Sequence, residues 1–494
     1  MFPPPKETLA PMSADFESQP MIKATGFREY DARWLFPDEI NLTGMQALGL
    51  GLGTLLHERN AAHIIVGHDF REYSQAVKLA LINGLMAAGV RVVDIGLALS
   101  PTAYYAQFAC DVPAVAMVTA SHNENGWTGV KMGSGRPLTF GAEDMARLRD
   151  IVLGGEAKAQ VGGTYEIVED MAAQYKADLT NRAAIAKKLK AVVATGNGTA
   201  GIFAPPVLEA LGVDVIPLHC ELDYTFPHHN PNPEDIGMLH AVRDAVLASG
   251  ADIGFAFDGD GDRCGVVDNQ GREIFADKMG VLIARNLATQ HKNAKFIVDV
   301  KSTGLFATDP ELKSLGASTE YWKTGHSYMK RHTHETGALA GFEKSGHYFF
   351  NTPIGRGYDD GILAAIVICD LLAETGQTMA TLHDSLPTTY ASPTMSPFCA
   401  DEIKYEVVER VIAQIKSRES FIGQAVKDIT CVNGIRVMVE DGTWGLVRAS
   451  SNKPSLVVVV ESPTSQKNLE AMFEEIDAIL STHSEVGEYD QKLK

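Results

Sequence analysis

A serine in a polar loop is the first residue whose surroundings suggest chemistry. The apolar run Ala114–Val118 predicts a buried strand, and Ser121 follows it in a polar stretch that ends at Lys131. Open α/β sheets place their ligands beyond the carboxyl ends of their strands. A lone Ser-His pair in such a loop more often only caps or turns the chain, so Ser121 needs support from other motifs.

The strongest motif is the segment 257–263, in which three aspartates alternate with glycines after a predicted strand. Asp258, Asp260 and Asp262 can converge on one cation because glycine permits a tight backbone path. Oxygen ligands favour Mg²⁺ over zinc or copper, and the segment lacks the glycine and glutamate positions of an EF-hand. A solvated acidic turn is the plainer alternative. A Mg²⁺ site beside a serine predicts phosphoryl transfer.

Three further loops hold side chains suited to a sugar or a phosphate. Segment 322–327 contains His326, although a lone histidine is more often structural. Glu343 and Ser345 lie two residues apart, and on an extended backbone they would face the same way and contact neighbouring sugar hydroxyls. Segment 448–453 groups cations and hydroxyls, as a phosphate clamp or merely a polar hairpin would.

Composition limits the class of protein. A chain of 494 residues is too long for one core and predicts three to four domains. The formal charge of −19 argues against nucleic acids and anionic membranes as partners. The six cysteines form no CxxC pair, which predicts reduced thiols. The N-terminus lacks a signal peptide's apolar core, and segment 361–369 is too short to span a bilayer, so we expect a cytoplasmic protein.

Strands and helices alternate through most of the chain, which predicts parallel, helix-flanked sheets. The expected strands lie at 64–66, 90–95, 114–118, 191–194, 213–218, 253–257, 296–300 and 338–342. The expected helices lie at 75–88, 206–211, 233–248 and 361–374. The last part differs, with strands at 435–440 and 456–461 that flank a loop at 448–454, and a helix at 467–480.

The predicted fold class is α/β, with three similar α/β domains of mixed, largely parallel sheets and a smaller C-terminal α+β domain. We expect a flexible arm at 1–20, domain 1 with the serine loop at 21–163, domain 2 with the metal loop at 164–272, domain 3 with the sugar loop at 273–390, and domain 4 with the phosphate loop at 391–494.

In their order and combination, the motifs at 119–123, 258–263, 322–327 and 343–347 resemble those of the α-D-phosphohexomutase family, most closely its bacterial phosphomannomutase/phosphoglucomutase branch. The resemblance runs from about Phe27 to the C-terminal helix. It implies four domains around a central cleft. The chain departs from the family's usual pattern at Glu124, where proline is common, and at Phe342, Lys344 and the Ser451-Asn452 pair.

The resemblance also implies a role for each motif. Ser121 would be the phosphoserine, and would bind Mg²⁺ together with Asp258, Asp260 and Asp262. The implied catalytic residues are Ser121, Lys131, Arg33, His326 and Arg263, with Lys131 or His326 as general acid or base. The implied substrate-binding residues are Tyr30, Lys301, Glu343, Ser345, His347, Arg448, Ser450, Ser451 and Asn452.

The implied reaction is a reversible phosphoryl transfer between C1 and C6 of mannose or glucose phosphate, with hexose 1,6-bisphosphate as intermediate and activator. The expected partners are small hexose phosphates, and the expected state is a monomer or weak homodimer. A phosphoglucosamine mutase would use the same site. A phosphatase with Asp258 as nucleophile and a non-catalytic sugar-phosphate sensor are the alternatives from other classes.

Overall fold

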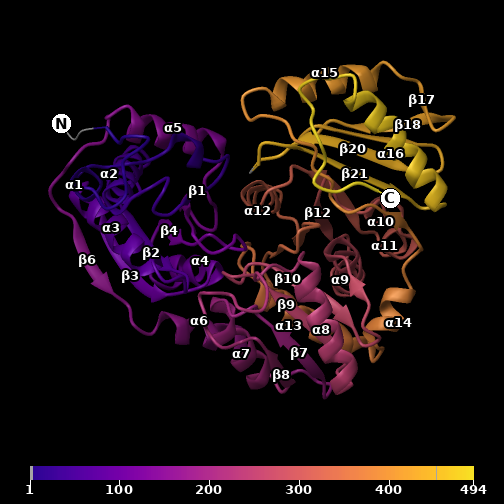
Figure 1. The fold of residues 1–494 in the computed structure, drawn as a ribbon. Helices are drawn as coiled ribbons and strands as arrows, with labels where there is room; N and C mark the ends of the chain where they lie inside the picture. Colours follow the sequence, from indigo (N-terminus) through magenta and orange to yellow (C-terminus); the bar gives the residue numbers. More distant parts are fainter. Residues whose placement is uncertain (1–3, 452, 494) are drawn as a thin grey trace. The chain divides into compact units, whose positions relative to one another are not determined.

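The computed structural model describes residues 4–451 and 453–493 (Figure 1). Asn452, one of the predicted substrate-binding residues, lies outside the described residues. The chain divides into two compact units. Unit 1 consists of Met1–Ala276 and Ser345–Thr381, and unit 2 consists of Asp277–Lys344 and Leu382–Lys494.

The first sheet of unit 1 has six strands in the order β1-β5-β4-β2-β3-β6. The strands β2 (His63–His68), β3 (Arg91–Leu97), β4 (Ala114–Val118) and β6 (Thr164–Ile167) run parallel. β5 (Trp127–Ser134) pairs antiparallel with β4 and with β1 (Ala32–Leu35). The sheet is therefore mixed and largely parallel, as predicted.

Helices cover both faces of this sheet. Ile64 and Val66 of β2 pack in one core with α2 (Leu42–Glu58), α3 (Ser74–Ala87) and α5 (Ala142–Leu153). Ile65 packs in a second core with α4 (Ser100–Ala109). Successive strand residues point to opposite faces, so a strand buried on both faces is apolar throughout.

The second sheet of unit 1 has the order β11-β10-β9-β7-β8. β7 (Lys190–Ala194), β8 (Asp214–Leu218) and β9 (Ile253–Phe257) are parallel. β10 (Cys264–Asp268) is antiparallel to β9, and β11 (Glu273–Ile274) is antiparallel to β10. α8 (Ile236–Ser249) packs on one face, and α7 (Ala204–Ala210) and α13 (Gly361–Thr375) also belong to this part. The aspartate segment is the tight connection between β9 and β10.

Unit 2 contains the parallel strands β13 (Ser318–Trp322), β12 (Lys295–Asp299) and β14 (Ala340–Phe342), with β12 in the middle. α9 (Ala276–Gln290) and α12 (His326–Glu335) accompany them. The C-terminal sheet is antiparallel, in the order β16-β21-β20-β19-β18-β17. Its strands are β16 (Tyr390–Ala391), β17 (Ser420–Phe421), β18 (Gln424–Thr430), β19 (Ile435–Val439), β20 (Trp444–Ala449) and β21 (Leu456–Ser462), and one face is covered by α15 (Lys404–Lys416) and α16 (Gln466–Leu480).

The remaining elements are short or peripheral. They are α1 (Ala14–Ser18), η1 (Ala24–Gly26), α6 (Met171–Thr180), η2 (Thr199–Ile202), α10 (Leu305–Thr308), α11 (Pro310–Ser314), β15 (Tyr348–Phe350) and α14 (Met379–Asp384). The six cysteines are free thiols, as predicted. Among the described residues, no helix is long and apolar enough to cross a membrane.

Two sequence-based expectations about elements were wrong. β20 was not predicted, so Arg448 lies on a strand rather than in a loop. The turn before β20 holds Asp441-Gly442 with a left-handed Gly442 (φ 89°), an Asp-Gly signal typical of hairpins that could have revealed the strand. α8 begins at Ile236 instead of residue 233, because the Asp235 side chain accepts a hydrogen bond from the Met238 amide and caps the helix there.

Candidate active site

The turn after β4 holds Ser121 in an unusual conformation. Its φ is 50°, in the left-handed region that residues other than glycine rarely adopt, and such strain tends to concentrate at functional sites. The buried guanidinium of Arg71 donates hydrogen bonds to the carbonyls of Ser121 (3.1 Å), Asn123 (2.6 Å) and Glu124 (3.0 Å). Arg71 therefore fixes the backbone on both sides of His122.

The aspartate segment meets this serine loop. The Ser121 hydroxyl donates to Asp258 Oδ2 at 2.8 Å. Lys131 Nζ lies 2.7 Å from Asp260 Oδ2 and also contacts Asp262 Oδ2. The three carboxylates are fully buried, and each offers an oxygen within 4.8 Å of the others. The structure thus brings together the serine, the lysine and the three aspartates that the sequence singled out.

The buried charges shift one another's pKa values. Burial, and then the neighbouring Asp262 and Asp260, raises the pKa of Asp258 well above its ordinary value. Burial also opposes ionisation of Asp262, but Lys131, His347 and Arg263 together outweigh it and hold that pKa well below its ordinary value. Burial would lower the pKa of Lys131, but Asp260 and Asp262 raise it well above its ordinary value. Lys131 is therefore a cation paired with two of the three carboxyls, and the third, of Asp258, lies 3.7 Å from Arg263 Nε.

The carboxylates fit a divalent metal ion. Asp260 Oδ1 is buried and accepts no hydrogen bond from any residue between 4 and 493 that the structure describes. Asp262 Oδ1 has His347 Nε2 nearby at 3.4 Å but no hydrogen bond within the same residues. Oxygens that are buried without a donor are costly unless a cation compensates them. Three carboxylates suit a hard cation such as Mg²⁺.

Two arginines lie beside the serine loop, one on β1 and one at the end of the aspartate segment. Arg33 on β1 donates to the carbonyl of Ala120 at 3.0 Å and also to Asn123. Arg263 Nη2 donates to His122 Nδ1 at 3.0 Å, so the lone pair of that nitrogen is engaged by Arg263. Burial and then Arg263 lower the pKa of His122 well below its ordinary value, which keeps the ring neutral.

Other predicted residues of unit 1 complete the surroundings. Tyr30 is buried in the turn before β1. His347 forms an isolated β-bridge with Arg263, and its Nε2 lies 3.4 Å from Asp262 Oδ1 and 3.8 Å from Asp359 Oδ2. Ser345 Oγ lies 3.1 Å from His347 Nδ1. His347 was predicted only as a substrate-binding residue, but it lies against the metal loop.

In unit 2, the loops that follow β12, β13 and β14 meet at one carboxylate. Asp299 accepts hydrogen bonds from Ser302 Oγ, from Thr324 Oγ1 at 3.0 Å and from the amide of Lys344 at 3.2 Å. Lys301 Nζ lies 4.0 Å from Asp299 Oδ2. Asp299 thus joins the three segments that carry Lys301, His326 and Glu343.

Glu343 also organises its own neighbourhood. Its Oε1 accepts a hydrogen bond from the amide of Gly325 at 2.6 Å, directly before His326, which is buried at the start of α12. The expectation that Glu343 and Ser345 share an extended backbone was wrong, because residues 344 and 345 form a turn. The boundary between the two units also falls between them.

The predicted phosphate loop lies at the end of β20. Arg448 is buried, and its Nη1 donates to Asn433 Oδ1 at 3.2 Å and to the carbonyl of Ala449 at 2.7 Å. The Ser450 hydroxyl accepts from the amide of Lys453 at 3.2 Å. Ser451 is half-buried beside it.

Sequence reasoning missed three residues that hold the predicted ones. These are Arg71, Ser100 and Asp299. Ser100, at the start of α4, donates to Asp260 Oδ2 at 2.6 Å. Ser100 and Asp299 each lie just beyond or at the carboxyl end of a parallel strand, the rule that singled out Ser121. Arg71 carried no comparable signal.

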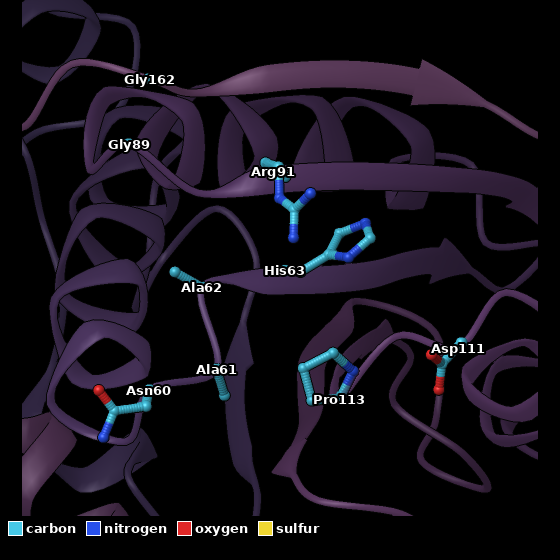
Figure 2. A pocket seen from close by; sticks show the side chains of 9 residues that line it. All are labelled: Asn60, Ala61, Ala62, His63, Gly89, Arg91, Asp111, Pro113 and Gly162. Carbon is cyan, nitrogen blue, oxygen red and sulfur yellow. The ribbon is translucent and has the colours of Figure 1, made fainter.

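A pocket of about 400 Å³ lies elsewhere on the first sheet (Figure 2). It is lined by residues such as His63, Arg91 and Pro113, at or before the first residues of β2, β3 and β4. The serine loop follows the opposite, carboxyl end of β4. The pocket contains none of the predicted site residues and is separate from the site.

Comparisons with known proteins agree with this geometry. Four family models match: phosphoglucomutase/phosphomannomutase α/β/α domain I at residues 24–159, domain II at 168–271, domain III at 275–390 and the C-terminal domain at 399–479. Phosphomannomutase/phosphoglucomutase of Pseudomonas aeruginosa is 34% identical over 91% of this chain and 94% of its own length. A probable phosphoglucosamine mutase of Methanopyrus kandleri is 30% identical over 94% of this chain and 98% of its own length.

A crystal structure shows the same fold. The phosphoglucomutase/phosphomannomutase family protein of Burkholderia thailandensis superimposes with a TM-score of 0.85 at 30% identity, covering 94% of this chain and 98% of that one. The four matched domains span most of the chain in the family's order, and the serine and aspartate loops meet in unit 1. The chain therefore belongs to the phosphoglucomutase/phosphomannomutase family.

Proposed function

We propose that the protein transfers a phosphoryl group reversibly between C1 and C6 of a hexose phosphate, mannose or glucose phosphate, through a phosphoserine at Ser121 and a hexose 1,6-bisphosphate. The observation that carries the proposal is the contact of Ser121 Oγ with Asp258 Oδ2 at 2.8 Å, beside two more buried carboxylates. A hydroxyl needs such surroundings because it is a weak nucleophile by itself.

The transfer exchanges one P–O bond for another. The bond between phosphorus and Ser121 Oγ breaks as the bond to the free sugar hydroxyl forms, and the hydroxyl proton leaves to a base. The hexose 1,6-bisphosphate then reverses its orientation in the site, and its other phosphoryl group is transferred to Ser121. Mg²⁺, held by Ser121, Asp258, Asp260 and Asp262, would neutralise charge on the phosphoryl group.

The chain's own groups have distinct tasks in this scheme. Arg33 and Arg263 supply fixed positive charge beside the serine loop. The raised pKa of Lys131 keeps its ammonium protonated, which leaves His326 as the candidate general base. Lys301, Glu343, Ser345 and His347 would bind the sugar. The non-reacting phosphate would be bound by Arg448, Ser450, Ser451 and Asn452.

The test measures hexose 6-phosphate formation from glucose 1-phosphate and from mannose 1-phosphate, with Mg²⁺ and trace glucose 1,6-bisphosphate. We expect turnover of at least one sugar, and loss of more than about 1,000-fold in Ser121→Ala because the phosphoryl carrier is gone. Ser18→Ala, at an exposed serine at the end of α1, is the control. Equal activity of Ser121→Ala and the wild type would refute the proposal.

A phosphoglucosamine mutase is the second candidate, favoured by the likeness to the Methanopyrus kandleri relative. Glucosamine 1-phosphate as a third substrate in the same assay ranks the two. A phosphatase with Asp258 as nucleophile would form an acyl phosphate that hydroxylamine cleaves, whereas a phosphoserine resists it. The hydrogen bond from Ser121 to Asp258 favours the serine.

A further inference from the structure

One face of the C-terminal sheet packs on a loop that carries a predicted substrate residue. α15 and α16 cover the other face. Trp444, Leu446, Val457 and Val459 form a buried cluster with Val300. Val300 directly follows β12, and Lys301 is the next residue. The predicted sugar-binding loop at 300–304 is therefore in contact with the C-terminal domain inside unit 2.

Arg436 on β19 holds this loop on both sides of Lys301. Its Nη1 donates to the carbonyl of Val300 at 2.9 Å and to the carbonyl of Ser302 at 2.8 Å. The guanidinium lies 3.6 Å from the ring centroid of Trp444 and 4.3 Å from that of Tyr321. Arg436 is 5% exposed, and its contacts with two rings and two carbonyls restrict the conformations of its side chain.

Glu461 on β21 holds the end of the same loop. Its Oε1 accepts hydrogen bonds from Thr303 Oγ1 at 3.0 Å, from the Gly304 amide at 2.8 Å and from Trp444 Nε1 at 3.3 Å. Glu461 is 2% exposed. Arg436 and Glu461 together therefore bind four backbone or hydroxyl groups of residues 300–304, and Lys301 lies between the two residues whose carbonyls Arg436 binds.

We propose that Arg436 and Glu461 are positioning residues of the substrate site. They place the Lys301 ammonium through the peptide groups that flank it, so the affinity for the sugar phosphate depends on two side chains of the C-terminal domain. The inference rests on the proposed function, because it takes Lys301 to bind substrate. Apolar side chains could join two domains at less cost than buried charges, which supports a task beyond packing.

The test is a double-mutant cycle in the full-length protein. Arg436→Met keeps an apolar stem against Trp444 but removes both donors. We expect KM to rise about tenfold with a smaller change in kcat, because hydrogen bonds from a charged group are worth that much. In the Lys301→Met background, Arg436→Met should lower kcat/KM little further, because the ammonium group that Arg436 positions is already absent.

Hydrogen exchange measured by mass spectrometry provides a readout that does not need activity. Residues 300–304 should exchange faster in Arg436→Met than in the wild type. Ile476→Ala is the control, since Ile476 is buried in the core on the other face of the sheet. It should lower stability and speed exchange in α16 without changing KM or exchange at 300–304.

Two results would overturn the inference: a loss in Arg436→Met that adds in full to that of Lys301→Met, or unchanged KM and unchanged exchange. Failure of the proposed function looks different, because the wild type itself would then turn over no hexose phosphate. In that case, the affinity for glucose 6-phosphate, measured by calorimetry, tests the positioning role of Arg436. Weaker binding in Arg436→Met together with faster exchange would support the positioning role, and equal binding would refute it.

Discussion

Lys131 is the residue on which the charge balance of the site depends. It is the cation placed between Asp260 and Asp262, and its distances to their oxygens are those of strong ion pairs. A metal ion held by the three aspartates would therefore share its buried carboxylates with Lys131. The two should substitute for each other in part.

Lys131→Met should lower stability by about 3 kcal/mol without metal, because it leaves buried carboxylates unpaired. Mg²⁺ should recover part of the loss, so Tm should rise more with Mg²⁺ in the variant than in the wild type. Thermal unfolding in EDTA and in saturating Mg²⁺ measures this.

Lys78→Met is the matched control. Lys78 on α3 is paired at 2.6 Å with Asp94 on β3 of the same domain, and it is as buried as Lys131. Asp94 belongs to neither of the groups of described residues that could hold a metal ion. The stability that Lys78→Met loses should be the same with and without Mg²⁺. A Mg²⁺ effect of equal size in both variants would contradict the shared role of Lys131 and the metal.

Gly259 shows how tightly two loops meet. A Cβ at this position would lie 2.6 Å from the carbonyl oxygen of Ser121, closer than any carbon can approach without movement. Gly259→Ala should displace the serine loop from the metal loop and lower kcat/KM about 100-fold, because small misplacements of reacting groups cost that much. Steady-state kinetics measures this.

Gly141→Ala is the control for Gly259→Ala, because a Cβ at Gly141 meets no atom within 4 Å. Its activity should equal that of the wild type. If Gly259→Ala kept full activity too, the close approach of the two loops would not matter for catalysis.

At the scale of single elements, α13 begins with a buried carboxyl group. Asp360 caps the helix by accepting from the Leu363 amide at 2.9 Å, and it also accepts from the Tyr175 hydroxyl at 2.9 Å. Burial raises the pKa of Asp360 to about 6. The folded protein then binds this proton more tightly than the unfolded chain, so stability falls as pH rises from about 4 to about 6.

Asp360→Asn keeps the cap but cannot ionise. Relative to the wild type, it should become more stable by about 2–3 kcal/mol as pH rises from 4 to 6.5, since each pKa unit is worth about 1.4 kcal/mol. Thermal unfolding at both pH values measures the difference. Asp235→Asn, at the partly exposed cap of α8, is the control for replacing a capping carboxylate by an amide. A gain independent of pH would contradict the raised pKa.

The elements predicted correctly from the sequence have a clear apolar run or a clear signal at one end. The buried runs at β4 and β9 and the aspartate segment after β9 were predicted correctly, because they depend on neighbouring residues alone. β20 was missed because Gly445 and Arg448 interrupt its apolar pattern. The roles of Arg71 and Arg436 could not be predicted, because each bonds to backbone groups distant in sequence.

At the scale of the whole molecule, the domains of unit 2 depend on each other at Val300. Val300→Asp would bury an unpaired carboxylate between them, at a cost of several kcal/mol. We expect the C-terminal domain to unfold as a separate transition at lower temperature in scanning calorimetry. Val161→Asp, at a valine that is 99% exposed, should leave the profile unchanged. One unaltered transition in Val300→Asp would contradict this coupling.

The division of the chain into units has a consequence for its synthesis. Unit 1 takes in Ser345–Thr381, which follows the first segment of unit 2. That late segment brings His347 to Asp262 and packs α13 on β10. A ribosome releases residues in order, and domains generally fold as they emerge. The aspartate loop is thus made long before its histidine neighbour, and unit 1 stays incomplete while residues 277–344 of unit 2 are translated.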